Sequence, residues 1–190
     1  MADYPGYRPD RYWEVEDATH RNDVVTSAYE PGSVVKSLTL AAALDAGVIE
    51  PTDTYMDEGG IEVGGRYLQN ADRRAHGTTT MTELLAKSLN VGAVHVAKEL
   101  GAPRFYEAFR NFGFGEVAGI DLAGEQGGRL KVPDDGEWTQ SDLGTNSYGQ
   151  GISTTPIQVV AAYGALANGG VRMRPYVVAE QRYITTTERY

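Results

Sequence analysis

The segment Glu30-Pro31-Gly32-Ser33-Val34-Val35-Lys36 opens the first strongly periodic part of the chain. Proline and glycine interrupt whatever precedes them, and apolar residues then recur at helical spacing up to Gly47. We therefore expect a helix over residues 33–47, with Ser33 able to cap its start. Lys36 is unusual there, because it stands in an otherwise apolar helix where a surface lysine is not expected.

Ser33 and Lys36 are three residues apart at this helix start, so their side chains are expected on one face and within reach of each other. A serine hydroxyl becomes nucleophilic when a neighbour takes its proton, and a lysine can do so if burial lowers its pKa. The backbone N–H groups of a helix start could also stabilise an oxyanion. The alternative interpretation is a helix cap followed by an ordinary lysine.

A second polar group interrupts a helical pattern at Ser88-Leu89-Asn90. Serine and asparagine side chains compete for backbone hydrogen bonds, which favours a junction between two helices at residues 88–90. The hydroxyl could relay a proton, and the amide of Asn90 could hold a peptide-like group from its donor and acceptor sides. A purely structural polar junction remains the alternative.

The remaining pattern predicts a mixed α and β chain. Gly64-Gly65 predicts a tight hairpin turn within residues 61–68, and Thr80 with Glu83 has the spacing of a capping box that starts a helix through residue 86 or 87. The other expected elements are an extended or looped segment at 1–32, helices at 91–100, 103–112 and 155–168, an irregular segment at 113–151 and a strand at 171–184. A single closing strand needs a sheet from elsewhere, because its backbone groups are otherwise unpaired.

Composition excludes several classes of function. The chain has 190 residues, 41% hydrophobic and 23% charged, which suits one domain or part of one. A net charge of −9 without a basic stripe argues against a nucleic-acid partner. The absence of cysteine excludes disulfides, a zinc-thiolate site and a cysteine nucleophile. We see neither a membrane-spanning run nor a signal peptide.

Other candidate sites are weaker. The histidines His20, His76 and His95 lack metal-ligand spacing and have no evident acidic partner, so we expect no metal site and no catalytic triad. The acidic pairs are expected to be solvated surface, although two carboxylates could in principle serve a glycosidase. Gly113-x-Gly115 follows a helix and lacks a third glycine, which argues against a dinucleotide cofactor. We expect no cofactor.

Taken together, the motifs resemble those of the penicillin-binding proteins, class B in particular. The first two active-site motifs correspond to Tyr29-Glu30-Pro31-Gly32-Ser33-Val34-Val35-Lys36 and Lys87-Ser88-Leu89-Asn90-Val91-Gly92. Supporting segments are Met1-Ala2-Asp3-Tyr4-Pro5, Phe112-Gly113-Phe114-Gly115, Gly119-Ile120-Asp121-Leu122 and Tyr148-Gly149-Gln150-Gly151-Ile152-Ser153-Thr154-Thr155-Pro156. The similarity extends over essentially the whole chain.

The resemblance implies a D,D-transpeptidase that cross-links peptidoglycan. Ser33 would attack the carbonyl between the terminal D-alanines of a stem peptide with Lys36 as general base, and would form an acyl-enzyme. Ser88 would pass the proton to the departing D-alanine, and Asn90 would bind the substrate amide. β-Lactams would acylate Ser33. The implied partners are stem peptides, β-lactams and, for the parent enzyme, other divisome or elongasome proteins, on the extracytoplasmic face of the bacterial membrane.

One family motif is absent. A Lys-Thr-Gly or Lys-Ser-Gly strand should follow the last helix, yet no lysine occurs after Lys131. The expected fold is therefore α+β of the penicillin-binding and serine β-lactamase type, mainly its helical part, with much of the central antiparallel sheet missing. We expect residues 1–190 to be a partial transpeptidase domain, truncated at both ends and impaired in isolation, since one lost oxyanion donor can reduce turnover about 100-fold to 1,000-fold.

Two alternative functions remain open from the sequence. A serine β-lactamase or D,D-carboxypeptidase would use water as the acyl acceptor, and Ser-x-Asn does not separate these enzymes from transpeptidases. The glycine-rich segments after Asn90 favour the transpeptidase. A non-catalytic penicillin-binding or scaffold module is the alternative from a different class.

Overall fold

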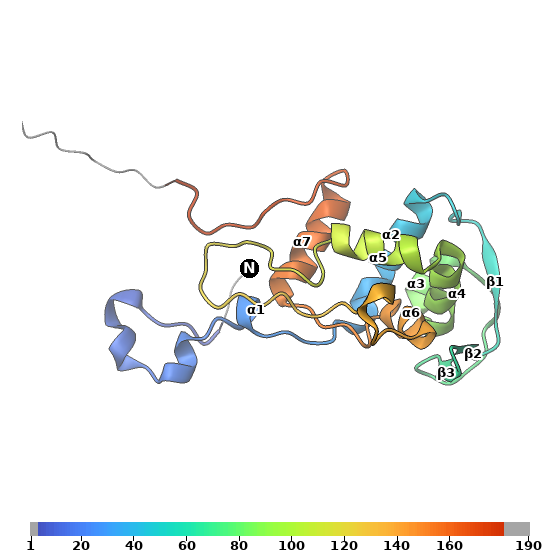
Figure 1. The fold of residues 1–190 in the computed structure, drawn as a ribbon, viewed down its shortest axis with the longest axis horizontal. Helices are drawn as coiled ribbons and strands as arrows, with labels where there is room; N and C mark the ends of the chain where they lie inside the picture. The colour runs from blue at the N-terminus through green and yellow to red at the C-terminus, as the bar shows by residue number, and fades with distance from the viewer. Residues whose placement is uncertain (1–3, 181–190) are drawn as a thin grey trace, which may run out of the picture.

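The structure, a computed structural model, describes residues 4–180. Helices dominate it and two small antiparallel sheets lie at one end, which confirms the expected helix-rich α+β fold (Figure 1). The α-helices are α1 Asp23–Thr26, α2 Lys36–Asp45, α3 Met81–Lys87, α4 Asn90–Leu100, α5 Ala102–Asn111, α6 Gln140–Asn146 and α7 Pro156–Ala167. The 3-10 helices are η1 Pro9–Glu14, η2 Asp17–His20, η3 Gly32–Val35 and η4 Pro133–Asp135.

Each sheet is a pair of four-residue strands. β1 (Thr54–Asp57) pairs with β4 (Gly77–Thr80), and β2 (Gly60–Val63) pairs with β3 (Arg66–Gln69). The β2–β3 hairpin confirms the predicted turn, in which Gly64 and Gly65 both have positive φ, +56° and +77°. The β1–β4 pair was not predicted, because neither short strand shows an apolar alternation that a sequence pattern could reveal.

Helix α4 is the central element of the helical part. It packs against α2, α5 and α6 and against strands β1, β2 and β3, and most of its residues from Val91 to Leu100 are buried. Glycine and alanine at three positions of α4 let these neighbours approach closely. The main core continues through the ring cluster of Phe105, Phe109 and Phe114, each at most 1% exposed. Burial of each such side chain stabilises the fold by about 1.5–3 kcal/mol.

Most predicted helix boundaries are confirmed. Thr80 and Glu83 form the predicted capping box, with Glu83 N–H donating to Thr80 Oγ1 over 3.1 Å and Thr80 N–H to Glu83 Oε2 over 3.0 Å. Helix α7 begins at Pro156, as a first-turn proline allows. The junction between α3 and α4 falls at residues 88–89.

Four expectations about local structure were wrong. Ser33 does not cap a helix: the chain enters through η3, whose N-cap is Pro31, and no side chain caps it. The segment 113–151 contains α6 and η4, and residues 1–32 contain 3-10 turns and α1. Residues 171–180 form no strand, and residues 181–184 of that prediction lie outside the described part.

The reason for the missing strand is visible in its hydrogen bonds. The carboxylate of Asp121 accepts the N–H groups of Val177 (2.6 Å) and Val178 (2.8 Å). Arg174 Nε donates to the carbonyl of Gly119 over 2.6 Å. A loop carboxylate and a loop carbonyl therefore bind the groups of this segment in place of a strand ladder.

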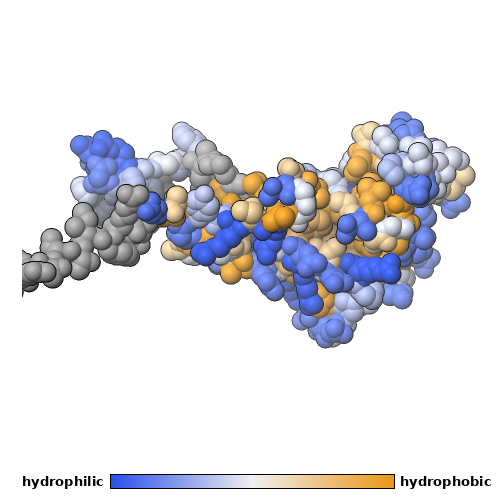
Figure 2. Space-filling view, turned by 90° about the horizontal axis from the view of Figure 1, so that it is seen from above, coloured by the Kyte–Doolittle hydropathy of each residue, from blue (hydrophilic) through white to orange (hydrophobic). Residues whose placement is uncertain are grey.

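Apolar side chains are partly exposed on α2 and α7. Figure 2 shows apolar surface over the half of the molecule that holds the helices, interrupted by polar patches. The exposed apolar residues of these elements and of η3 are Val34, Leu44, Val160, Tyr163 and Leu166. In residues 4–180 we find no helix with the length and apolar character that crossing a membrane requires.

The close packing around α4 leads to a stability prediction. A Cβ added at Gly92 would meet Leu84 Cδ1 at 2.5 Å and lie closer still to the Tyr55 hydroxyl, whereas one added at Gly164 of α7 would meet nothing within 4 Å. Gly92→Ala should therefore lower the free energy of unfolding by about 1–3 kcal/mol through overpacking. The matched control Gly164→Ala should raise it by about 0.5–1 kcal/mol. Urea unfolding measures both, and equal effects would contradict the packing described here.

Candidate active site

Ser33 lies in η3, at the entrance to α2, with its side chain exposed. Within residues 4–180 its hydroxyl makes no hydrogen bond, so no neighbour competes with a reactant for it. The preceding Gly32 has a φ of +62°, a conformation that glycine adopts without strain. This turn presents Ser33 to solvent while the following residues enter the core.

The glycine-rich segment 148–151 packs against the turn at Gly32 and is hydrogen-bonded to it. Gly32 N–H donates to the carbonyl of Gly149 over 3.0 Å, and Tyr29 exchanges two 2.9 Å backbone hydrogen bonds with Thr154. A side chain at Gly149 would collide with the backbone of Gly32, and its φ is +82°. The predicted supporting segment is thus in direct contact with the lead-in to Ser33.

The junction of η3 and α2 is also tied to α7. Tyr163 donates its hydroxyl to the carbonyl of Val34 over 2.6 Å and lies 2.5 Å from Ser37 Oγ. The N–H of Lys36 donates to the carbonyl of Ser33. Main-chain atoms on both sides of Ser33 are therefore held by other parts of the fold.

Lys36 is the most buried charged side chain at the site, only 1% exposed. Its Nζ donates to the carbonyl oxygen of Ser88 over 2.5 Å and to Ser88 Oγ over 3.0 Å. No carboxylate pairs with it anywhere in residues 4–180. Burial, which penalises the ammonium, lowers the pKa of Lys36 to about 8.

Ser88 ends α3 in the left-handed region, with φ +54° and ψ +48°. A residue other than glycine with positive φ is uncommon, and such strain is frequent where a side chain must be aimed. Here it turns the chain from α3 into α4 while both the carbonyl and the hydroxyl of Ser88 face Lys36. The predicted polar junction thus contacts the predicted base.

Asn90 is the first residue of α4 and is half-buried. Its Nδ2 donates to the main-chain carbonyl of Gln69 at the end of β3 over 2.9 Å. Its side-chain oxygen has no partner within residues 4–180 and can accept an N–H. The sequence could not indicate the role of Gln69, because the contact uses its backbone and not its side chain.

The structure brings two of the four predicted residues, Lys36 and Ser88, into direct contact. Lys36 contacts Ser88, and Asn90 follows Ser88 by two residues. The expected direct contact of Ser33 with Lys36 is not a hydrogen bond here, because Lys36 points into the core toward Ser88 whereas Ser33 is exposed. Hydrogen bonds of catalytic groups often shorten only when substrate binds.

The histidines lie away from this group. His76 has an acidic partner that was not predicted, since its Nε2 lies 3.0 Å from Asp72 Oδ2. His20 contacts the carbonyl of Tyr12, and the ring of His95 stacks on Tyr55. In the part of the chain that the structure describes, no three His, Cys, Asp or Glu residues are grouped so that they could hold a metal ion.

Known proteins are similar to this chain in sequence and in fold. Residues 1–189 match the family "Penicillin binding protein transpeptidase domain". Stage V sporulation protein D of Bacillus subtilis is 39% identical over 183 residues, and peptidoglycan D,D-transpeptidase FtsI of Escherichia coli is 28% identical over 171 residues. These matches cover 95% and 90% of the chain, but the chain spans only 28% of each relative.

Solved structures give the same result. Penicillin binding protein 3 from Mycobacterium tuberculosis, in complex with aztreonam, superposes with a TM-score of 0.77 at 34% identity. The match covers 83% of this chain and 35% of that chain.

The burial of Lys36 predicts a specific pH dependence of stability. The pKa of Lys36 in the folded chain, about 8, lies below its ordinary value of 10.5, so the unfolded chain binds more protons between these pH values. The free energy of unfolding should therefore rise with pH across that window, relative to Lys36→Met, by about 2–3 kcal/mol at pH 10. Urea unfolding from pH 7 to pH 10 measures the difference, and parallel curves for the two proteins would contradict the lowered pKa of Lys36.

Proposed function

Because the chain belongs to the penicillin-binding protein transpeptidase family, we propose that it forms the part of a D,D-transpeptidase domain that carries the nucleophile. Homologues named as peptidoglycan D,D-transpeptidases support this activity, and they do not favour the β-lactamase or scaffold alternatives. The family's link to β-lactams is seen in the aztreonam complex of its solved relative. The proposed roles are Ser33 as nucleophile, Lys36 as general base, Ser88 as proton relay and Asn90 as substrate ligand.

The observation that carries the proposal is the burial of Lys36 against Ser88. With a pKa of about 8, roughly a tenth of the Lys36 amine is neutral at pH 7, whereas an exposed lysine would be almost fully protonated. A neutral amine can accept the proton of a nearby hydroxyl. The exposed Ser33, one turn away, carries a hydroxyl that makes no hydrogen bond within residues 4–180.

The proposed reaction has two steps. Ser33 Oγ bonds to the carbonyl carbon between two terminal D-alanines while its proton moves to Lys36 Nζ. The C–N bond then breaks, the proton passes through Ser88 Oγ to the leaving amine, and an ester on Ser33 remains. The amino nitrogen of a second stem peptide bonds to the ester carbonyl carbon, the bond from that carbon to Ser33 Oγ breaks, and a proton lost by the amine restores the Ser33 hydroxyl.

Asn90 is proposed to orient the stem peptide during both steps. Its Nδ2 is engaged by Gln69, so the side-chain oxygen is the atom that can accept a substrate N–H. An amide held at one end loses little rotational freedom when the other end binds, which favours a defined substrate orientation. Asn90→Ala should therefore weaken substrate positioning more than it weakens the reactivity of Ser33.

We further propose that residues 1–190 act as a partial transpeptidase domain on the extracytoplasmic face of the membrane. The partial domain is supported by the 28% coverage of the relatives and by the absence of Lys-Thr-Gly and Lys-Ser-Gly from the sequence, and the location is proposed from the peptidoglycan enzymes among the relatives. Divisome or elongasome proteins are proposed partners of the parent enzyme. Turnover by residues 1–190 alone should be low, because they hold no Lys-Thr-Gly or Lys-Ser-Gly motif to supply an oxyanion donor.

A labelled penicillin tests the proposal directly. Mass spectrometry of the folded chain after incubation should show a stable adduct on Ser33, because the β-lactam carbonyl mimics the D-alanyl-D-alanine bond. Ser33→Ala should abolish the adduct, while the matched control Ser141→Ala, on α6, should leave it unchanged. Absence of any adduct on the folded wild-type chain would overturn the proposal, and rapid release of hydrolysed drug would indicate a β-lactamase.

The pH profile and two further variants test the assigned roles. The acylation rate constant should rise with pH through about pH 8, as Lys36 loses its proton. Lys36→Met should remove this dependence and nearly all acylation. Ser88→Ala should reduce acylation about 100-fold or more. A flat profile from pH 6 to pH 9 in the wild-type chain would contradict Lys36 as the base.

A further inference from the structure

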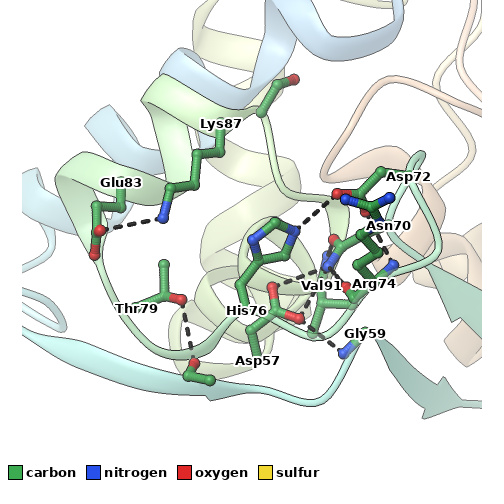
Figure 3. Close-up of polar contacts among 12 residues, drawn as sticks. Asp57, Gly59, Asn70, Asp72, Arg74, His76, Thr79, Glu83, Lys87 and Val91 are labelled. Atoms are coloured by element: carbon green, nitrogen blue, oxygen red, sulfur yellow. Dashed lines mark hydrogen bonds and ion pairs between the residues drawn. The ribbon is translucent and has the colours of Figure 1, made fainter.

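A buried carboxylate lies close to the candidate site and has no part in the proposed reaction. Asp57, at the end of β1, is 1% exposed, and Figure 3 shows its hydrogen bonds with Gly59 and Asn70. It accepts the Tyr55 hydroxyl (3.1 Å), the Gly59 N–H (2.8 Å) and the amide Nδ2 of Asn70 at both carboxylate oxygens (2.9 and 3.0 Å). Burying a carboxylate costs free energy unless hydrogen bonds compensate it. The donors around Asp57 provide these hydrogen bonds, and they hold the carboxylate in one orientation.

Asn70 connects this carboxylate to helix α4. It follows β3 directly and is 2% exposed. While its Nδ2 is held by Asp57, its Oδ1 accepts the backbone N–H of Val91 over 3.0 Å. Asp57, together with the carbonyl of Arg74, which also accepts Asn70 Nδ2 over 3.2 Å, fixes which end of the Asn70 amide faces α4, since a rotated amide would present a donor to the Val91 N–H.

This hydrogen bond meets a need that the chain around α4 cannot meet locally. The first N–H groups of a helix have no partner within it, and a polar residue at the N-cap normally accepts one of them. The N-cap of α4 is Leu89, whose side chain cannot accept, and no side-chain cap bond is present there. Asn70 therefore supplies from β3 the cap that Leu89 cannot supply.

Two neighbouring residues of the hairpin thus bind two neighbouring residues of α4. The carbonyl of Gln69 accepts a hydrogen bond from Asn90 Nδ2, and Asn70 Oδ1 accepts one from the N–H of Val91. Two contacts in adjacent positions fix both the position and the rotation of the helix start. Ser88, two residues before Asn90, contacts Lys36.

We propose that Asp57 and Asn70 are positioning residues of the acylation site, which hold the start of α4 so that Asn90 and Ser88 keep the geometry that the substrate requires. The inference rests on the proposed function for the roles of Asn90 and Ser88. Asp57 and Asn70 touch neither Ser33 nor Lys36, so they act through α4. A displacement of about 1 Å at such a site can cost 100-fold in rate.

The first test uses Asn70→Ala and reads the start of α4 without any drug. Amide hydrogen exchange at Val91 should become about tenfold faster or more, because its buried hydrogen bond is lost. The side-chain amide resonances of Asn90 should shift in the NMR spectrum. The matched control Asp72→Asn changes the same loop at its surface pair with His76 and should leave both signals in place.

The second test separates positioning from stability. Asn70→Ala should lower the second-order acylation rate constant by a labelled penicillin about 10-fold to 100-fold. Leu100→Ala weakens α4 at its other end, where it cannot move Asn90. The temperature is chosen so that Leu100→Ala has the same free energy of unfolding as Asn70→Ala. Under that condition Leu100→Ala should be acylated at the rate of the wild-type chain at the same temperature.

The third test exchanges the two partners. Asn70→Asp places two carboxylates in contact and should impair both readouts, since like charges repel. Asp57→Asn combined with Asn70→Asp restores one charge, one amide and an acceptor for Val91. The double variant should therefore recover at least half of the loss that Asn70→Asp causes in the logarithm of the acylation rate constant and of the Val91 exchange rate.

Each outcome decides the inference. The inference is overturned if Asn70→Ala leaves the Val91 exchange rate and the Asn90 resonances unchanged. It is also overturned if Asn70→Ala and Leu100→Ala lower the acylation rate constant equally. A double variant that recovers neither readout would overturn it as well. If the wild-type chain is not acylated at all, the proposed function fails, and the Val91 and Asn90 signals with the partner exchange still support or overturn the positioning role.

Discussion

The burial of one lysine against one serine organises this protein. Lys36 can lie 1% exposed only because the carbonyl and hydroxyl of Ser88 accept its hydrogen bonds. That pair links α2 to the turn between α3 and α4, two parts of the chain about fifty residues apart. The desolvation that lowers the pKa of Lys36 is therefore a product of the helix packing, and the proposed chemistry depends on the same contacts as the fold.

The surrounding structure holds the two ends of this link in place. Behind Ser33, the backbone of Gly149 packs against Gly32 so closely that no side chain fits between them. Beyond Ser88, the end of β3 and the residue after it hydrogen-bond to the start of α4 through Gln69 and Asn70. These supports use backbone groups and buried amides, which suits parts that must hold a geometry without reacting.

Local patterns predicted much of the secondary structure. The turn at Gly64-Gly65, the capping box of Thr80 with Glu83 and the start of α7 at Pro156 depend on short-range geometry, and each is confirmed. The failures share a cause as well. Strands β1 and β4 exist because they pair with each other, and residues 171–180 form no strand, since the loop at Gly119 and Asp121 binds groups of Arg174, Val177 and Val178. No local pattern records those distant partners.

By itself, the sequence determined the family and the identity of Ser33, Lys36, Ser88 and Asn90 as candidates, because residue type and spacing along a helix start are local properties. Only the tertiary structure decided where the lysine points, which is to Ser88 and not to Ser33. It also decided that Asn70 caps α4 in place of Leu89, and that Asp57 is buried beside it. These contacts join residues 13 to 52 positions apart, and their energies arise from desolvation and packing that exist only once the chain has folded.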